Sequence, residues 1–141
     1  MQKYSQSILY FCQEKSISGP DLPMALQSHA LLHINNTCSM IIGGSNYPDF
    51  YASTFYFDHN NGDWINGSKL IQARSVHAAG IVTDELTNEK FAAVTGGVDG
   101  HVGLLDSIEI LIDDEWISGI KNVFRKYKNI LDDVASSSSS Q

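Results

Sequence analysis

The chain repeats itself, and each repeat carries a pair of adjacent glycines. Gly43-Gly44 and Gly96-Gly97 both end an apolar run, and a tryptophan follows each pair, Trp64 and then Trp116. The glycine pairs lie 53 residues apart (43 to 96), and the tryptophans lie 52 apart (64 to 116). Self-similarity at a period of about fifty residues indicates stacked supersecondary units, because one such unit cannot bury its apolar face alone.

A third, partial copy lies near the N-terminus. The segment 16–19 aligns with 64–67, and the alignment continues without a gap until His29-Ala30 matches His77-Ala78. The sequence therefore contains the end of one unit, one full unit and most of another. We place the partial unit at residues 8–28 and the next two at 29–74 and 75–119.

Short apolar runs separated by polar turns predict an all-β fold. We expect strands at residues 7–12, 29–34, 38–43, 54–57, 64–65, 76–82, 90–95 and 104–112, and another at Trp116. In the run 104–112, Ile108, Ile110 and Ile112 recur at every second residue, as in a strand buried chiefly on one face. No helical period occurs before residue 119. Four-stranded units of this length, arrayed radially, are the plan of a β-propeller.

The repeat pattern ends after Gly119. Apolar residues between 120 and 134 fall at helical spacing with charges between them, which predicts an amphipathic helix. Four basic residues lie between positions 121 and 128, and we interpret them as the solvated face of that helix rather than as a membrane surface. Residues 135–141 are rich in serine and predict a disordered tail.

The composition restricts the partners and the compartment. The formal charge of −7 disfavours nucleic acid and anionic membranes, since both need a basic protein surface. No apolar run approaches the length of a membrane helix, and the N-terminus does not match a signal peptide, so we expect a cytoplasmic protein. Cys12 and Cys38 are expected to be buried free thiols, with one disulfide as the alternative.

The motifs resemble the kelch repeat of kelch-type β-propellers. The matching features are the two glycine pairs, the tryptophans downstream, Tyr56-Phe57 before a turn, and Arg74-x-x-His77-Ala78 at the start of a unit. The resemblance covers residues 8–119. It departs from the family pattern where Ser16 replaces a tryptophan, Leu26 stands at the position of Arg74, and Ile108-Glu109-Ile110 replaces an aromatic-Asp pair.

The resemblance implies a kelch-type propeller fragment of two to three four-stranded blades. Propellers close with about 4–8 blades, so this chain has too few for a ring. An open stack would leave exposed strand edges and an apolar end. Two explanations remain open: the chain is a truncated fragment, or it completes a propeller by self-association.

The resemblance also implies which surface binds a partner. In kelch propellers, the loop after the second strand of a blade and the loop between blades emerge on one face, which commonly binds a partner's peptide. Tyr47, Phe50 and Tyr51 are the leading candidates here, since aromatic residues are favoured at binding hot spots. An equally good explanation is that two of the three pack the loop onto its blade. The full set of predicted contact residues is Ser45, Asn46, Tyr47, Asp49, Phe50, Tyr51, Gln72, Arg74, Asp99 and His101.

Other repeated residues are expected to be structural. The glycine pairs allow tight turns and close backbone approach, the tryptophans pack between blades, and Arg74 lies over an aromatic ring or bonds to a carbonyl. This set comprises Gly43, Gly44, Trp64, His77, Gly96, Gly97 and Trp116.

Catalysis has little support in the sequence. The five histidines show no metal-ligand spacing, and Ser75 near His77 has no accompanying acid, so we expect no metal, no cofactor and no enzymatic activity. The predicted function is a protein–protein interaction module. In a longer parent, the resemblance implies a substrate-recognition adaptor of a ubiquitin ligase. The alternative is a fragment of a propeller enzyme of the galactose-oxidase-like class.

Overall fold

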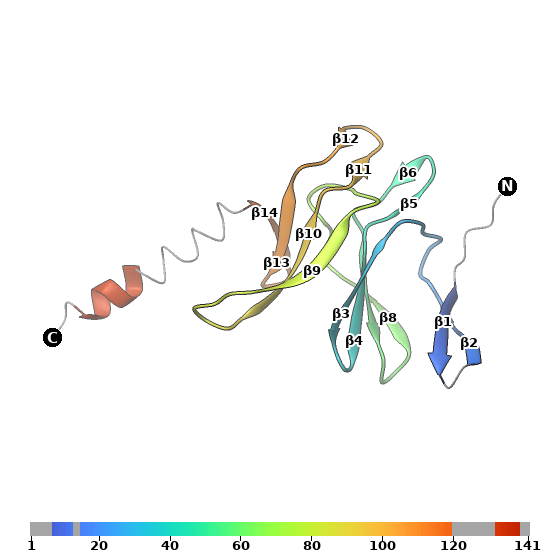
Figure 1. The fold of residues 1–141 in the computed structure, drawn as a ribbon, viewed down its shortest axis with the longest axis horizontal. Helices are drawn as coiled ribbons and strands as arrows, with labels where there is room; N and C mark the ends of the chain where they lie inside the picture. Colours follow the sequence, from blue (N-terminus) through green and yellow to red (C-terminus); the bar gives the residue numbers. More distant parts are fainter. Residues whose placement is uncertain (1–6, 13–14, 120–131, 139–141) are drawn as a thin grey trace.

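The computed structural model of the chain describes residues 7–12, 15–119 and 132–138, and it is mostly β-structure. Two four-stranded antiparallel sheets form its centre, and three two-stranded ribbons accompany them (Figure 1). The all-β class predicted from the sequence is confirmed.

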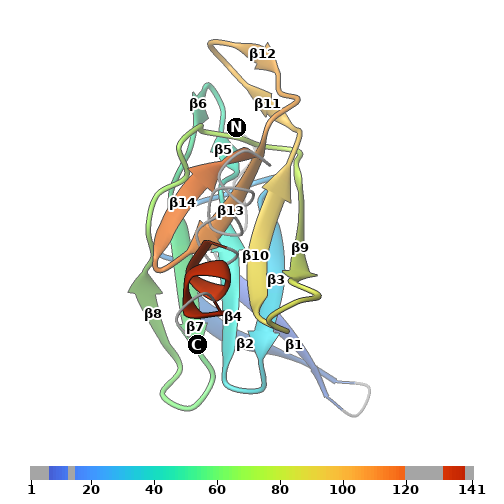
Figure 2. The same ribbon diagram turned by 90° about the vertical axis from the view of Figure 1, so that its left-hand side faces the viewer.

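Each four-stranded sheet is an antiparallel meander whose strands follow one another in chain order. The first sheet consists of β3 (Ala30–Asn35), β4 (Cys38–Ile42), β7 (Thr54–Asp58) and β8 (Asp63–Asn66). The second sheet consists of β9 (Ala78–Thr83), β10 (Lys90–Thr95), β13 (Ile108–Ile112) and β14 (Glu115–Ser118). The two sheets lie face to face, and their first strands, β3 and β9, are in contact (Figure 2).

The ribbons lie outside the two sheets. They pair β1 (Ser7–Cys12) with β2 (Lys15–Asp21), β5 (Ser45–Asn46) with β6 (Asp49–Phe50), and β11 (Val98–Asp99) with β12 (Gly103–Leu104). In the first ribbon Phe11 pairs with Ser16, as Phe57 pairs with Trp64 at the end of the first sheet. The β1–β2 ribbon therefore has the backbone pairing of the last two strands of a sheet.

Both glycine pairs make the same turn out of the second strand of their sheet. All four glycines have positive φ, between 59° and 106°, a region that residues with a Cβ rarely adopt. A Cβ atom on Gly44 would lie 2.9 Å from the Cβ of His29, and one on Gly97 would lie 2.9 Å from the Cβ of His77. The two units thus share one contact between a histidine and the second glycine of the pair.

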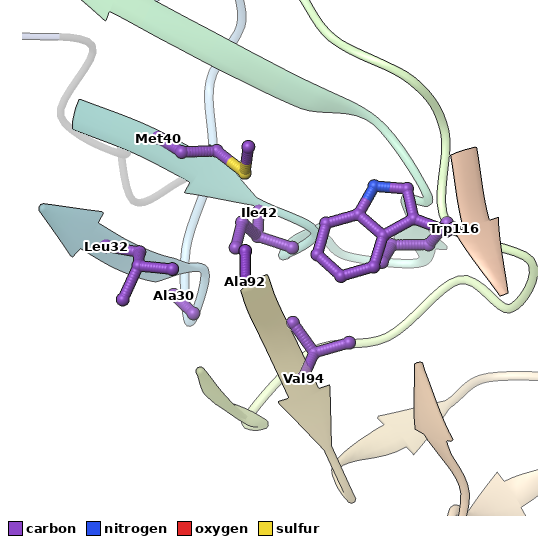
Figure 3. Close-up of a cluster of buried hydrophobic side chains, with 8 residues drawn as sticks. Ala30, Leu32, Met40, Ile42, Ala92, Val94 and Trp116 are labelled. Atoms are coloured by element: carbon purple, nitrogen blue, oxygen red, sulfur yellow. The ribbon is translucent and has the colours of Figure 1, made fainter. Parts of the chain in front are cut away.

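The main core lies between the two sheets. Met40 and Ile42 of β4 face Ala92 and Val94 of β10, with Trp116 of β14 packed beside them (Figure 3). Trp116 is 3% exposed, and its indole N–H donates to the carbonyl of Ser68 at 3.0 Å. Burial of this apolar surface is the main force that holds one sheet against the other.

A second core covers the opposite face of the first sheet. Leu22 and Leu26, from the segment before β3, pack against Ile41 and Phe55, and Trp64 lies at the edge of this cluster. The first sheet is therefore covered on both faces by residues that the structure describes.

Three sequence expectations need revision or comment. The predicted strand 104–112 is wrong in its first part, because Leu104 belongs to β12 and the strand of the second sheet begins at Ile108. Cys38 is a free thiol. The predicted helix 120–134 falls largely outside the described residues, but residues 132–138 are helical, four positions into the expected disordered tail. The hydroxyl groups of Ser136, Ser137 and Ser138 each donate to the carbonyl three residues earlier, which suits this helical turn.

Candidate functional site

Two small hairpins project side by side from the same end of the two sheets. The β5–β6 ribbon lies in the loop between the second and third strands of the first sheet, and β11–β12 lies in the matching loop of the second (Figure 1). They touch each other, because a Cβ atom on Gly100 would lie only 2.8 Å from the ring of Phe50. The chain thus places the loops of both repeats in one cluster.

The β5–β6 hairpin is anchored at its base and exposed at its tip. Ser45 is 5% exposed, its hydroxyl lies 3.1 Å from that of Ser75, and its backbone pairs with Gln27. Tyr47, at the tip, is 76% exposed. Of the three aromatic residues predicted here, only Tyr47 is presented to solvent, since Phe50 packs on Gly100 and Tyr51 joins the second core.

The β11–β12 hairpin is held by a buried aspartate. Asp99 is 5% exposed, and its carboxylate accepts the backbone N–H of His101 at 2.8 Å. The same carboxylate accepts the side-chain amide of Gln72, from the segment between the sheets. Asp99 and Gln72 therefore fix the position of the hairpin, while His101 lies exposed at its turn.

Arg74 lies inside the molecule. Its side chain has no exposed surface, and it forms an ion pair of 2.7 Å with Glu109, which is 1% exposed. Its guanidinium also donates to the carbonyls of Gly96 at 2.8 Å and Ser107 at 3.3 Å. The structure therefore shows the predicted hydrogen bond from Arg74 to a carbonyl group. The prediction that Arg74 is a contact residue is wrong, because its side chain is buried.

The exposed residues of the two hairpins form what we call the hairpin surface. It consists of Tyr47, Pro48, Asp49, Gly100, His101, Val102, Gly103 and Leu104. Of the other predicted contact residues, Ser45, Asp99 and Arg74 are buried, and Asn46, Phe50, Tyr51 and Gln72 are partly buried.

Two large apolar side chains of the hairpin surface, Val102 and Leu104, are not among the predicted contact residues. Val102 is 64% exposed and Leu104 is 87% exposed, which is unusual for apolar side chains that a short ribbon could turn inward. The available signal was that Gly100 and Gly103 punctuate this stretch, which favours a separate hairpin over a continuous strand. The strand predicted at 104–112 includes Leu104, whereas the structure places this residue in β12.

The hairpin surface combines apolar groups with acidic charge. Asp49 is exposed on it, Asp106 is exposed just beyond β12, and the two loops at 43–53 and 97–107 contain no lysine or arginine. Such a surface can bind a peptide through apolar and hydrogen-bonding contacts, with a preference for a basic one.

Catalytic arrangements are sparse in the part of the chain that the structure describes. Ser39 Oγ lies 2.9 Å from His59 Nε2 and 3.4 Å from His33 Nδ1, at the far end of the first sheet. Within the described residues neither histidine donates a hydrogen bond to a carboxylate, so the pair lacks the third group that orients a catalytic base. In residues 7–12, 15–119 and 132–138, no group of three His, Cys, Asp or Glu side chains is arranged to hold a metal ion.

Comparison with protein-family models and with curated proteins gave no match for this chain. In the part of the chain that the structure describes, no helix is long and apolar enough to span a membrane.

Proposed function

We propose that this chain is part of a kelch-type β-propeller and that it binds a protein partner through the hairpin surface. The repeated contact between a histidine and the second glycine of each pair supports the repeat relationship. The matching strand order of the two sheets supports two successive blades.

One observation carries the binding proposal. Tyr47 and Leu104 are exposed at 76% and 87% on adjacent hairpins whose bases are fixed by buried contacts. Large exposed side chains on a rigid support lose little conformational entropy on binding, which is the usual property of binding hot spots. A surface of this kind is suited to hold a peptide segment of a partner.

The test is selection of peptides from a displayed random library against the purified chain, followed by measurement of each affinity by calorimetry. The double variant Tyr47→Ala/Leu104→Ala is expected to weaken binding by about tenfold or more. Leu86→Ala is the matched control, since Leu86 is 77% exposed in the β9–β10 turn, away from the hairpins. Equal losses in the double variant and the control, or none in either, would contradict the proposal.

The wider role is proposed on the resemblance alone. A substrate-recognition adaptor of a ubiquitin ligase would use such a surface to hold its substrate, while a separate domain of a longer parent engaged the ligase. The cytoplasmic location and the self-association predicted from the sequence remain proposals of the same kind.

A further inference from the structure

A cleft lies between the two sheets, near the ends of the strands away from the hairpins. Its volume is about 580 Å³, within the range of about 300–1,000 Å³ typical of small-molecule sites. Apolar and aromatic side chains from both sheets line it, namely Met40 and Tyr56 on one side and Ile81, Ala92 and Leu111 on the other. It offers an interior with similar polar and apolar shares that opens to solvent.

The side chains that line the cleft are unequal in size. Met40 of β4 and Ala92 of β10 both line it, and Figure 3 shows the short side chain of Ala92 beside Ile42, with Met40 farther along β4. Two large residues here would fill the space between the sheets, whereas the alanine leaves it open. Ile81 of β9 also lines the cleft and is 39% exposed, so this wall of the cleft is accessible to solvent.

The rim of the cleft is acidic. Asp113 and Asp114 form the two-residue turn between β13 and β14, with φ of 51° and 60°. The hydroxyl of Ser68 donates to the carbonyl of Asp114, which fixes the turn against the segment that follows the first sheet. Within the described residues, neither aspartate carboxylate has an ion pair or a hydrogen bond.

The other charged groups that line the cleft do not neutralise the negative charge of this rim. Among the described residues that line the cleft, Lys90 is the one lysine or arginine, against the two carboxylates of Asp113 and Asp114, and His33 also lines it. The pKa of Tyr56 is raised, first by burial and then by the negative charge of Asp114, which indicates that the aspartate's field reaches into the cleft.

We propose that this cleft is a binding site for a small amphipathic cation, an ammonium group attached to an apolar chain or ring. The apolar part packs between Met40 and Leu111, and the ammonium lies at the rim beside Asp113 and Asp114. The site is separate from the hairpin surface, so the two proposals stand or fall independently.

The test uses n-octylammonium, n-octanol and octanoate as probes of equal chain length and different charge. Binding to the full chain is followed by methyl NMR, with the signals of Met40 and Leu111 as reporters. We expect n-octylammonium to bind about fivefold more tightly than n-octanol, as for a partly exposed ion pair, and octanoate to bind most weakly.

Three variants make the test specific. Asp113→Asn/Asp114→Asn removes the charge while keeping the turn, because asparagine adopts positive φ as readily as aspartate. This variant is expected to bind n-octylammonium and n-octanol equally. Ala92→Leu fills the cleft and is expected to abolish binding of both, whereas Asp49→Asn, on the hairpin surface, is the control and should leave both affinities unchanged.

Several results would overturn the proposal. Equal affinity of the wild-type chain for n-octylammonium and n-octanol would remove the cationic specificity. Binding that shifts signals elsewhere, or that survives Ala92→Leu in a variant whose NMR spectrum shows a folded protein, would exclude this cleft. Absence of binding by all three probes would also contradict it.

Discussion

His77 packs between glycines of the two sheets. A Cβ atom on Gly43, in the first sheet's glycine pair, would lie 2.9 Å from the Cε1 of His77. A Cβ atom on Gly97, in the second pair, would lie 2.9 Å from its Cβ. The imidazole therefore packs on backbone that only glycine leaves uncovered.

This environment disfavours the charged imidazole. Burial and then the positive charge of Arg74 lower the pKa of His77 to about 4, against a smaller opposing effect of the Ile42 backbone, and both ring nitrogens are buried without a hydrogen-bond partner among the described residues. Burial lowers the pKa of His29 as well. Both histidines are therefore held in their neutral form by the fold.

We expect the stability of the chain to fall between about pH 6.5 and pH 4. The unfolded chain binds a proton at His77 below about pH 6.5, whereas the folded chain binds it only below about pH 4. Since the unfolded state binds more protons in this window, the free energy of unfolding decreases as the pH falls. Urea denaturation at pH 8, 6.5, 5.5 and 4.5 measures the decrease.

His77→Gln should reduce that dependence on pH. The variant cannot titrate at this position, and its difference from wild type at pH 8 measures the change in packing alone. The remaining dependence includes the contribution of His29. Parallel curves for the two proteins from pH 8 to 4.5 would show that His77 does not contribute.

At the scale of elements, a buried ion pair joins the segment between the sheets to β13. Glu109 accepts the guanidinium of Arg74 at 2.7 Å and the backbone N–H groups of Ile71 at 2.7 Å and Gln72 at 3.1 Å. The carboxylate is thus fully occupied by donors from one segment. The arrangement fixes that segment across the second sheet.

In the first sheet, apolar residues occupy the positions that correspond to Arg74 and Glu109. Leu26 aligns with Arg74 in the repeat. Phe55 pairs with Ile41 of β4, and Glu109 pairs with Val94 at the equivalent position of β10, so Phe55 corresponds to Glu109. Leu26 and Phe55 pack together in the second core. Pro23 aligns with Ile71 and has no N–H, so the first unit has one backbone donor fewer at this position.

Arg74→Met is expected to cost about 3–5 kcal/mol, because it leaves the Glu109 carboxylate buried without a cation. Arg74→Leu/Glu109→Phe copies the pair of the first sheet and should be more stable than the single variant, although the N–H groups of Ile71 and Gln72 lose their acceptor. Urea denaturation at pH 7 gives both values. A double variant as unstable as Arg74→Met would show that the two units do not share this packing position.

The sequence is sufficient to predict most strands of the two four-stranded sheets, but it does not predict the short ribbons β5–β6 and β11–β12 or the strand register. Short apolar runs, polar turns and paired glycines predict an all-β chain with repeated units, because these features act locally. One unit has the apolar pair Leu26 and Phe55 where the other has the ion pair Arg74 and Glu109. This difference involves residues that are far apart in the chain, since Arg74 and Glu109 are 35 positions apart (74 to 109). Loop lengths differ between the units, so the equivalence of Phe55 and Glu109 becomes visible only with the strand pairing.

The candidate site shows the same limit. The position of the loops was predictable from the repeat, but the division into anchoring and exposed side chains was not. Asp99 is polar and yet buried, while Leu104 is apolar and yet 87% exposed. Hydropathy alone assigns both residues to the wrong environment, since their burial depends on Gln72 and on the short pairing of β11 with β12.

At the scale of the whole molecule, the two sheets differ in how they are covered. In the first sheet Ile42 is fully buried by the second sheet. Thr95, which occupies the matching position before the second glycine pair, is exposed. The face of the second sheet that carries Thr95 also carries Ile108, Ile110 and Ile117, as the strand pairing shows. Among the described residues no sheet packs on this face.

We therefore expect the purified chain to self-associate through this face. An apolar sheet face of this kind is buried by a neighbouring unit in a repeat architecture, and here a second copy is the available neighbour. Light scattering after size exclusion should give a mass above the 15.5 kDa of one chain that rises with protein concentration.

Ile110→Lys places a charge in the centre of the face and is expected to weaken association by about tenfold or more. Ile65→Lys, at a residue of β8 that is 55% exposed, is the control and should leave the mass unchanged. A wild-type mass of one chain at every concentration would show that no second copy covers the face, and the open stack would then have to be stable alone.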